Sequence, residues 1–298
     1  MSAFVVRRAV DAEFAVPPQL PYRVRGFRRR PVVGEADGAV HTGFGVCELK
    51  PDGVIGAHVH AYEESFHVLS GTVILDMPEG SYLLEEGDYG LLSTGVPHGW
   101  RGAGDTVAQW AEMLAPVPRA RYGYDTQAVP ATLPGEAVRI DVRDPRTRSF
   151  GHFEPAQMDP GKQSQDLLAA SASMRTALLV YSGIGVKMMV DGELGAVAST
   201  MFMVQYAPDG VAGAHDHPFE ETYLIVEGAV DAVFDGTRHR LEAGDAAWAG
   251  AGCVHEFSNA GPGPVRWLET QAPQPPSRHS YRFARDWNYL RDALKERT

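Results

Sequence analysis

Histidine and glutamate side chains occur in this sequence at spacings that suit a metal ion. His58 and His60 form a His-x-His pair, Glu64 follows, and His98 lies 34 residues beyond Glu64. Residues i and i+2 of a strand point to the same face, so His58 and His60 project together. Glu64 has the same parity and stays on that face if the chain remains extended. Three imidazoles and one carboxylate suit Fe²⁺, Mn²⁺, Ni²⁺, Co²⁺ or Zn²⁺.

The same pattern occurs a second time, 157 residues further along the chain. Pro51–Trp100 and Pro208–Phe257 align without a gap and share 18 identities in 50 positions. The period is too long for a solenoid, so each repeat is a whole domain. The sequence therefore predicts one metal site in each half, with the ligand sets His58, His60, Glu64, His98 and His215, His217, Glu221, His255.

The ligand number indicates what such a site could do. An octahedral ion with four protein ligands keeps two open positions, where water, dioxygen or a chelating substrate can bind. Tetrahedral zinc would be nearly closed, which is typical of a structural site. We expect one divalent ion per domain, with Fe²⁺ or Mn²⁺ favoured over Ni²⁺, Co²⁺ or Zn²⁺.

Short strands must position these ligands. The chain is rich in glycine (32) and proline (21), and short apolar or alternating runs are separated by glycine-containing turns, as in Val230–Phe234 followed by Asp235-Gly236. This pattern predicts an all-β sandwich or barrel. Closure of the sheet would bring His98, from another hairpin, opposite the first three ligands. Helices are expected only near Leu167–Leu179 and around Tyr281–Glu296.

The repeat also predicts the domain organisation. We expect an N-terminal domain over 1–118, including an arm of about forty residues that adds a strand. Residues 119–198 are expected to be a linker with the opening strands of the second unit. The C-terminal domain is expected over 199–298.

Each half resembles the two sequence motifs of the cupin superfamily. The first motif is Gly, His-x-His, three or four residues, Glu, six residues and Gly; the second is Gly, five residues, Pro-x-Gly, two residues, His, three residues and Asn. The motif proline is replaced by Ser93 and Gly250, and the asparagine, retained as Asn259, is replaced by Gly102. The matching positions are Gly53, His58, His60, Glu64, Gly71, Gly87, Gly95 and His98 in the first half, and Gly210, His215, His217, Glu221, Gly228, Gly244, Gly252, His255 and Asn259 in the second.

This resemblance covers roughly residues 44–118 and 201–275. It implies a bicupin, that is, two tandem cupin barrels (double-stranded β-helix, jelly-roll) with a few peripheral helices and the eight ligands above. None of the departures removes a ligand.

Strand parity also indicates which neighbours face the ligands. Phe66 and Trp100 are expected to line the first pocket, and the opposite parity turns His67, Glu63 and Glu220 outward. The second pocket is expected to be lined by Tyr223, Cys253, Phe257 and Asn259.

A repeated Trp-x-Glu places Glu112 and Glu269 at equivalent positions. Either carboxylate could be catalytic as a general base, could orient a ligand histidine, or could form an ion pair on the rim. Side chains further removed that could support the ligands are Glu48, Gln109, Gln205 and Gln271.

Composition narrows the function classes. A net charge of -11 argues against nucleic acid or an anionic membrane as a partner. Two isolated cysteines, Cys47 and Cys253, indicate a reducing compartment. Met1–Ala15 resembles neither a secretory signal nor a membrane span. We expect a cytoplasmic protein, a homodimer, that acts on a small molecule.

Three functions remain open. The first, which we favour, is a metal-dependent dioxygenase acting on a small organic acid, phenol or diketone. The second is a non-redox isomerase, lyase or hydrolase that uses Mn²⁺, Ni²⁺ or Zn²⁺ as a Lewis acid. The third is a non-catalytic metabolite-binding or regulatory cupin. Oxalate decarboxylases usually have four residues before the glutamate where this chain has three, and ureidoglycine aminohydrolases carry the acidic ligand before the histidines, so both are disfavoured.

Overall fold

The computed structural model describes residues 4–17, 23–130, 135–141, 143–159, 182–259, 261–275 and 282–283. These ranges are nearly all β, which confirms the predicted fold class, and none of their helices is long and apolar enough to cross a membrane. Their helical segments are the short 3-10 turns η1 (Glu35–Asp37), η2 (Ala120–Asp125), η3 (Pro145–Thr147) and η4 (Pro155–Met158). The predicted helix near Leu167–Leu179 lies outside the described residues. So does the one around Tyr281–Glu296, apart from Arg282–Phe283, which form strand β21.

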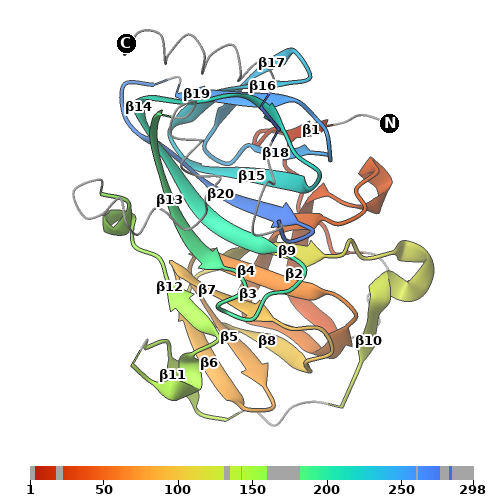
Figure 1. Ribbon diagram of the computed structural model, residues 1–298. Coiled ribbons are helices and arrows are strands. Elements are labelled where there is room, and N and C mark those ends of the chain that lie inside the picture. The colour runs from red at the N-terminus through yellow and green to blue at the C-terminus, as the bar shows by residue number, and fades with distance from the viewer. Residues whose placement is uncertain are drawn as a thin grey trace, which may run out of the picture. The chain divides into compact units, whose positions relative to one another are not determined.

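The strands of the N-terminal half form one curled sheet, coloured orange to green in Figure 1. Its strands follow the order β11-β6-β5-β8-β3-β9-β4-β7-β12, with β2 and β10 also paired to β3. Because β3 pairs with β8, His98 lies directly opposite His58. The strands are β2 (Val24–Val33), β3 (Gly43–His60), β4 (Glu63–Ser70), β5 (Thr72–Met77), β6 (Gly80–Glu85), β7 (Asp88–Leu92), β8 (His98–Ala103), β9 (Ala108–Ala115), β10 (Thr126–Ala128), β11 (Ala137–Arg139) and β12 (Phe150–His152).

The C-terminal half repeats this arrangement in a second curled sheet. The order is β1-β18-β15-β20-β14-β19-β16-β17, with β13 and β21 also paired to β14. Here His255 lies opposite His215, as His98 lies opposite His58. The strands are β1 (Phe4–Arg7), β13 (Ser182–Val190), β14 (Thr200–Asp216), β15 (Glu220–Glu227), β16 (Ala229–Phe234), β17 (Thr237–Glu242), β18 (Ala246–Ala249), β19 (His255–Asn259), β20 (Val265–Ala272) and β21 (Arg282–Phe283).

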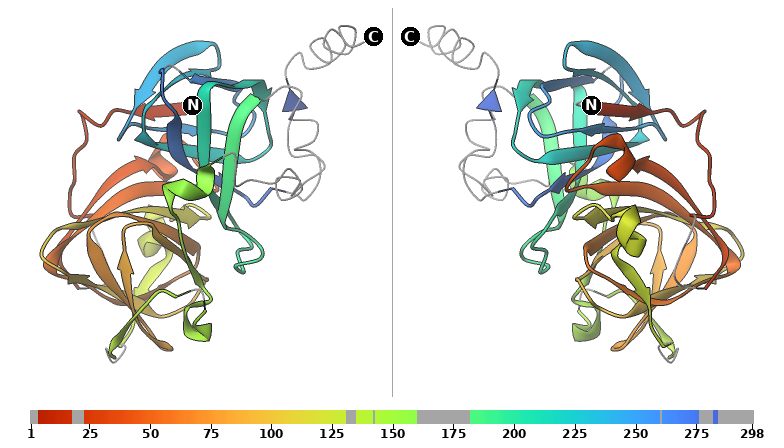
Figure 2. Two further views of the ribbon diagram at one scale, coloured as in Figure 1. Left: turned by 90° about the vertical axis from the view of Figure 1, so that its left-hand side faces the viewer. Right: turned by 90° about the vertical axis from the view of Figure 1, so that its right-hand side faces the viewer.

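The N-terminal arm adds a strand, but to the C-terminal sheet. Strand β1 pairs antiparallel with β18 (Figure 2, where β1 is dark red beside the blue strands). The chain accordingly divides into two compact units, one of 12–154 and 189–201 and one of 1–11, 155–188 and 202–298. Within the predicted linker 119–198, β10–β12 pair with the N-terminal sheet and β13 with the C-terminal sheet. The three predicted domain ranges stay a prediction.

Each sheet encloses its own apolar core. In the N-terminal half the core is aromatic, and Phe66, Trp100 and Trp110 are each at most 2% exposed. In the C-terminal half Tyr223 and Trp267 take equivalent places, each 1% exposed. Burial of this much apolar surface is the main force that closes each sheet. It also places the inward-facing polar residues in a dry environment.

The motif departure at Gly102 has a structural cause. A Cβ at this position would lie 1.9 Å from the carbonyl oxygen of Lys50, because the backbone of Lys50 and Pro51 fills the space directly. In the second half Asn259 spans the wider gap, and its Nδ2 donates to the carbonyl of Ala207 over 2.8 Å. The Asn259 side chain therefore links the backbone at Ala207 and Gly263 by hydrogen bonds. It does not line the metal pocket, contrary to expectation.

Candidate metal centres

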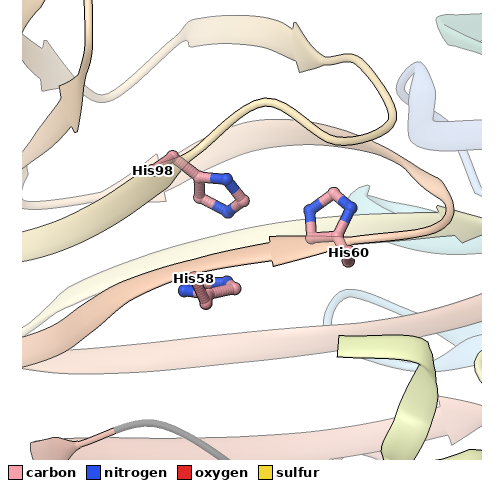
Figure 3. Close-up of side chains that lie close together, drawn as sticks. All are labelled: His58, His60 and His98. Atoms are coloured by element: carbon pink, nitrogen blue, oxygen red, sulfur yellow. The ribbon is translucent and has the colours of Figure 1, made fainter. Parts of the chain in front are cut away.

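The four predicted ligands of the N-terminal half converge inside its barrel. Figure 3 shows the rings of His58 and His60, from β3, turned toward His98 at the start of β8. The ring centroid of His98 lies 4.2 Å from that of His58 and 4.9 Å from that of His60. Oε2 of Glu64 lies 3.3 Å from Nε2 of His60 and 3.6 Å from Nε2 of His98. All four side chains are buried.

The C-terminal half reproduces this geometry closely. The ring centroid of His255 lies 4.3 Å from that of His215 and 4.9 Å from that of His217. Oε2 of Glu221 lies 2.9 Å from Nε2 of His217 and 3.3 Å from Nε2 of His255. In each half, one donor atom from each of the three histidines lies within 4.8 Å of the other two.

Two local irregularities of the backbone aim the ligands. A register shift between Ile55 and His58 marks a β-bulge just before the His-x-His pair, and bulges redirect the side chains that follow. The chain then bends at residues 61–62, so Glu64 comes from the next strand, β4. The condition of an extended chain between His60 and Glu64 is therefore not met, although the Glu64 carboxylate still reaches the histidines.

All six histidines are oriented by the backbone. Each Nδ1 lies 2.7–3.0 Å from a carbonyl oxygen, which can only accept, so Nδ1 carries the proton. In the bend after each His-x-His, His60 also stacks on Tyr62, and His217 on Phe219, with interplanar angles of 6° and 3°. Fixing Nδ1–H leaves the Nε2 lone pair of each ring for a metal ion.

Burial sets the charge of these groups. Desolvation, with the nearby His98, lowers the pKa of His58 to about 3, and desolvation with His255 lowers the pKa of His215 to about 3. Burial alone would raise the pKa of Glu64, but the closeness of His60 and His98 holds it well below its usual range. His217 and His255 likewise hold the pKa of Glu221 well below its usual range. Each centre thus offers an anionic carboxylate and a neutral first histidine, the forms that bind metals.

The donor set fits a divalent ion. The Nε2 atoms of His60, His98 and His255 are buried and make no hydrogen bond of good geometry. Burial of an imidazole nitrogen without a partner costs free energy, and a cation between the rings and the carboxylate would satisfy it. Neutral nitrogen donors with one oxygen donor suit a borderline first-row ion.

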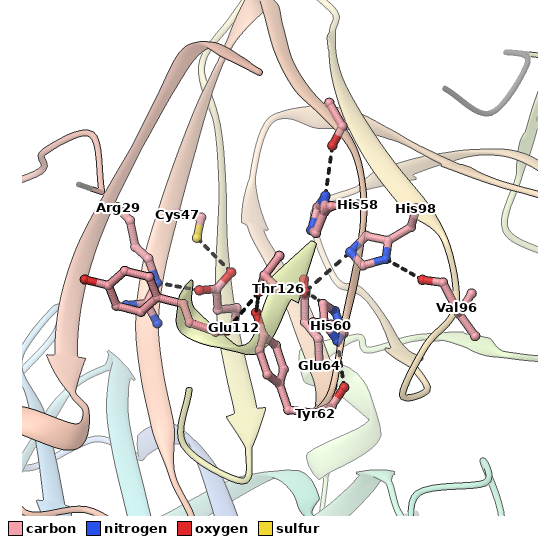
Figure 4. A network of polar contacts seen from close by, with 12 residues as sticks. Arg29, Cys47, His58, His60, Tyr62, Glu64, Val96, His98, Glu112 and Thr126 are labelled. Carbon is pink, nitrogen blue, oxygen red and sulfur yellow. Dashed lines mark hydrogen bonds and ion pairs between the residues drawn. The ribbon is translucent and has the colours of Figure 1, made fainter. Parts of the chain in front are cut away.

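The two Trp-x-Glu carboxylates lie in different surroundings. Glu112 forms an ion pair with Nε of Arg29 and accepts a hydrogen bond from Sγ of Cys47 over 3.1 Å (Figure 4). Glu269 instead accepts from Nε1 of Trp267 over 2.9 Å. Burial and the charge of Glu221 raise the pKa of Glu269 well above its usual range. Glu112 is thus an ion-paired carboxylate, whereas burial beside Glu221 favours the protonated form of Glu269.

Of the more distant polar candidates, only Gln271 contacts a proposed ligand, donating to Glu221 over 2.6 Å. Glu48 instead bonds Arg28 and Gln109, over 2.6 and 2.9 Å. Gln205 accepts from Arg266 over 2.7 Å.

Several predicted neighbours are packing residues. Phe66 and Trp100 meet edge to face with centroids 5.1 Å apart, inside the N-terminal core. Cys253 and Phe257 belong to the C-terminal core. The hydroxyl of Tyr223 is different, because it donates to Oε2 of Glu221.

The residues expected to face outward are buried. Glu63 is 3% exposed and accepts hydrogen bonds from the backbone of Val197 and Ala198, each over 2.8 Å. Glu220 is 4% exposed. His67 is 5% exposed and packs edge-on to Phe153. Parity identified the outer face, but later segments of the chain cover that face.

The sequence reasoning missed Arg29, because it lies outside the repeat and no motif marks it. It also missed the hydroxyl role of Tyr223, which the comparison of the repeats could have revealed, since Phe66 occupies the equivalent position.

Comparison with known proteins supports the two-domain organisation. A family model described as "Cupin domain" matches residues 45–114 and 202–270. No curated protein matches the sequence significantly.

Solved structures of two oxalate decarboxylases match the fold over nearly the whole chain. The enzyme of Lactobacillus farciminis, in a formate complex, is 16% identical with a TM-score of 0.61, covering 98% of this chain and 93% of that one. The enzyme of Bacillus subtilis at pH 4.6 is 13% identical with a TM-score of 0.61, covering 98% and 82%. A further structure of the Bacillus subtilis enzyme, 14% identical with a TM-score of 0.62 and coverage of 98% and 84%, concerns its Mn(II) centres. At these identities the likeness shows the fold alone.

Proposed function

Because this chain belongs to the cupin superfamily and carries one cupin domain in each half, we propose that it is a divalent-metal-dependent lyase acting on a small organic acid. The observation that carries the proposal is the position of Glu269. This carboxyl is buried in the C-terminal half, opposite Tyr223 and beside the proposed ligand Glu221, without a cationic partner among the described residues. A group so placed can deliver a proton to a reacting carbon.

Two halves of the site have separate tasks in this proposal. A divalent ion such as Mn²⁺ or Fe²⁺, when bound, would supply Lewis acidity toward substrate oxygen atoms. The imidazoles and the ligand carboxylate, His215, His217, His255 and Glu221, hold the ion. The structurally similar enzyme with Mn(II) centres favours Mn²⁺.

The proton balance suits decarboxylation. When the bond between the carboxylate carbon and its neighbour breaks, carbon dioxide leaves and the remaining carbon takes a proton. Glu269 donates this proton and regains one from solvent. Its hydrogen bond from Trp267 holds the carboxyl in place. Glu112 suits this task less, because Arg29 stabilises its charged form.

The test is turnover by protein depleted of metal and reloaded with Mn²⁺ or Fe²⁺, offered oxalate and other small mono- and dicarboxylic acids. We expect metal-dependent release of carbon dioxide without stoichiometric oxygen uptake. Glu269→Gln should lower kcat about 10²–10⁴-fold while retaining bound metal, and Glu112→Gln should have the smaller effect. Full activity of Glu269→Gln would refute the assigned role.

A dioxygenase remains the second candidate, since the aromatic barrel interior also suits dioxygen and an apolar acid or phenol. Consumption of one dioxygen per substrate, with Fe²⁺ alone active, would select it. Tight binding of acids without turnover would select a non-catalytic binding protein. A cytoplasmic location and a homodimer stay predictions.

A further inference from the structure

The carboxylate of Glu221 is held on both of its oxygen atoms. Gln271 donates from Nε2 to Oε1 over 2.6 Å, and the hydroxyl of Tyr223 donates to Oε2. Oε2 also faces Nε2 of His217 and His255, at 2.9 and 3.3 Å. Glu221 and Tyr223 are each 1% exposed and Gln271 is 4% exposed, so water does not compete for these contacts.

The N-terminal centre lacks both donors. The positions equivalent to Tyr223 and Gln271 are Phe66 and Leu114, which have no polar side-chain atom. Leu114 lies beside Glu64 on the neighbouring strand, as Gln271 lies beside Glu221. Among the described residues, the polar partners of the Glu64 carboxylate are the imidazoles of His60 and His98, at 3.3 and 3.6 Å.

Hydrogen bonds to a ligand carboxylate fix its plane and lower the cost of ordering it when the ion binds. With Oε1 bonded to Gln271, Glu221 presents Oε2 alone to the ion. Glu64 has no such constraint and can present one oxygen or both. The centres therefore differ in their carboxylate, although their histidines superimpose in sequence and spacing.

We propose that Tyr223 and Gln271 are positioning residues that make the C-terminal centre a pre-organised, one-oxygen carboxylate site, distinct from the N-terminal centre in metal affinity and coordination. This inference rests on the proposed function only in that both centres bind a divalent ion. It assigns the tighter binding of Mn²⁺ to the C-terminal half.

The experiment measures Mn²⁺ binding at each centre separately, in full-length protein whose other centre has lost a ligand. His60→Ala leaves the C-terminal centre, and His217→Ala leaves the N-terminal centre. Titration with Mn²⁺ should give the tighter binding in His60→Ala, and electron paramagnetic resonance of the bound Mn²⁺ should give two different spectra. Adding Tyr223→Phe and Gln271→Leu to His60→Ala should weaken binding about 10–100-fold and shift the spectrum toward that of the N-terminal centre.

Matched variants separate positioning from general damage. Tyr82→Phe removes the hydroxyl of a buried tyrosine of β6 that packs against Phe150 and belongs to neither ligand set, so in the His217→Ala background it should leave affinity and spectrum unchanged. The single change Tyr223→Phe removes one oxygen atom and covers the case in which the double variant fails to fold. Phe66→Tyr with Leu114→Gln, in the His217→Ala background, should move the N-terminal spectrum toward the C-terminal one.

The outcomes are distinguishable. Identical spectra and affinities for the two centres, or no change on removing Tyr223 and Gln271 donors, would overturn the inference and leave the proposed function standing. No bound Mn²⁺ in either single-centre variant would overturn both.

Discussion

Arg29 and Glu112, 83 residues apart in the sequence, form an ion pair inside the N-terminal barrel. Arg29 reaches Glu112 across Gly45, where a Cβ would lie 2.7 Å from Cζ of the arginine. The side chains are 18% and 11% exposed, so the pair is largely removed from water. Cys47 donates to the second carboxylate oxygen. Glu112 therefore forms a structural ion pair. Its repeat equivalent, Glu269, accepts a hydrogen bond from Trp267 instead.

The first prediction concerns this pair. Arg29→Met leaves the Glu112 carboxylate buried without its cation, and breaking a buried pair in this way typically costs about 3–5 kcal/mol. Denaturant unfolding of the metal-free protein should show this loss in the transition of the N-terminal barrel. Arg139→Met removes an exposed pair with Glu85, whose side chains are 67% and 49% exposed, and should cost about 0–1 kcal/mol. Equal losses in the two variants would contradict the buried-pair reading.

The second prediction is a pH dependence set by His67. Burial and the charge of His152 lower its pKa from the usual 6.5 to about 4, and its buried Nδ1 has no hydrogen-bond partner. The unfolded chain therefore binds more protons than the folded one between these values. The contribution of neutral His67 to the free energy of unfolding is fully present above pH 6.5. It declines as the pH falls toward 4, by up to about 1.4 kcal/mol per pH unit.

The matched variant is His67→Leu, which removes the titration and keeps an apolar side chain against Phe153. Its unfolding free energy should fall less steeply than that of the wild type between pH 6.5 and 4. The two proteins differ only at position 67, so the difference of the two curves reports on His67. Parallel curves would show that His67 does not titrate as assigned.

The sequence predicts the site residues that a repeated motif marks, and it does not predict those that no motif marks. The eight proposed ligands were found because the duplication repeats His-x-His, Glu and a distant His in register. Arg29 left no signal, since its role depends on a long-range strand pairing, β2 on β3, and on the room above Gly45. Parity predicted the face of His67 and not its burial, because the covering segment around Phe153 is remote in sequence.

The same limit applies to the repeat itself. An alignment treats Gly102 and Asn259 as a lapsed and a retained motif position. In the structure both close the same gap, one with backbone and one with a side-chain amide. The replacement of the Asn259 amide by close backbone packing at Gly102 can be recognised only from the positions of the Lys50 and Ala207 carbonyls in the structure.

The third prediction follows from that gap. Gly102→Ala would set a Cβ 1.9 Å from the carbonyl oxygen of Lys50, which is backbone and cannot rotate away. Overpacking of this kind costs about 1–3 kcal/mol or more, so the midpoint of thermal unfolding of the N-terminal barrel should fall. Gly34→Ala is the control, because its Cβ would meet nothing within 4 Å and its φ of -167° is ordinary extended backbone. If both substitutions are tolerated alike, the close approach at Gly102 is not present in solution.

The fourth prediction tests the two centres by stoichiometry. Protein purified without added metal should carry two equivalents of divalent ion per chain by elemental analysis, since both donor sets converge. His60→Ala and His217→Ala should each lose one equivalent, because the three ligands that remain in the altered centre bind the ion more weakly than four. His41→Ala, at a histidine that belongs to neither set, should keep two. Full metal content in both ligand variants would show that the ion binds elsewhere, and a single equivalent in the wild type would show that only one half of the duplication still holds its ion.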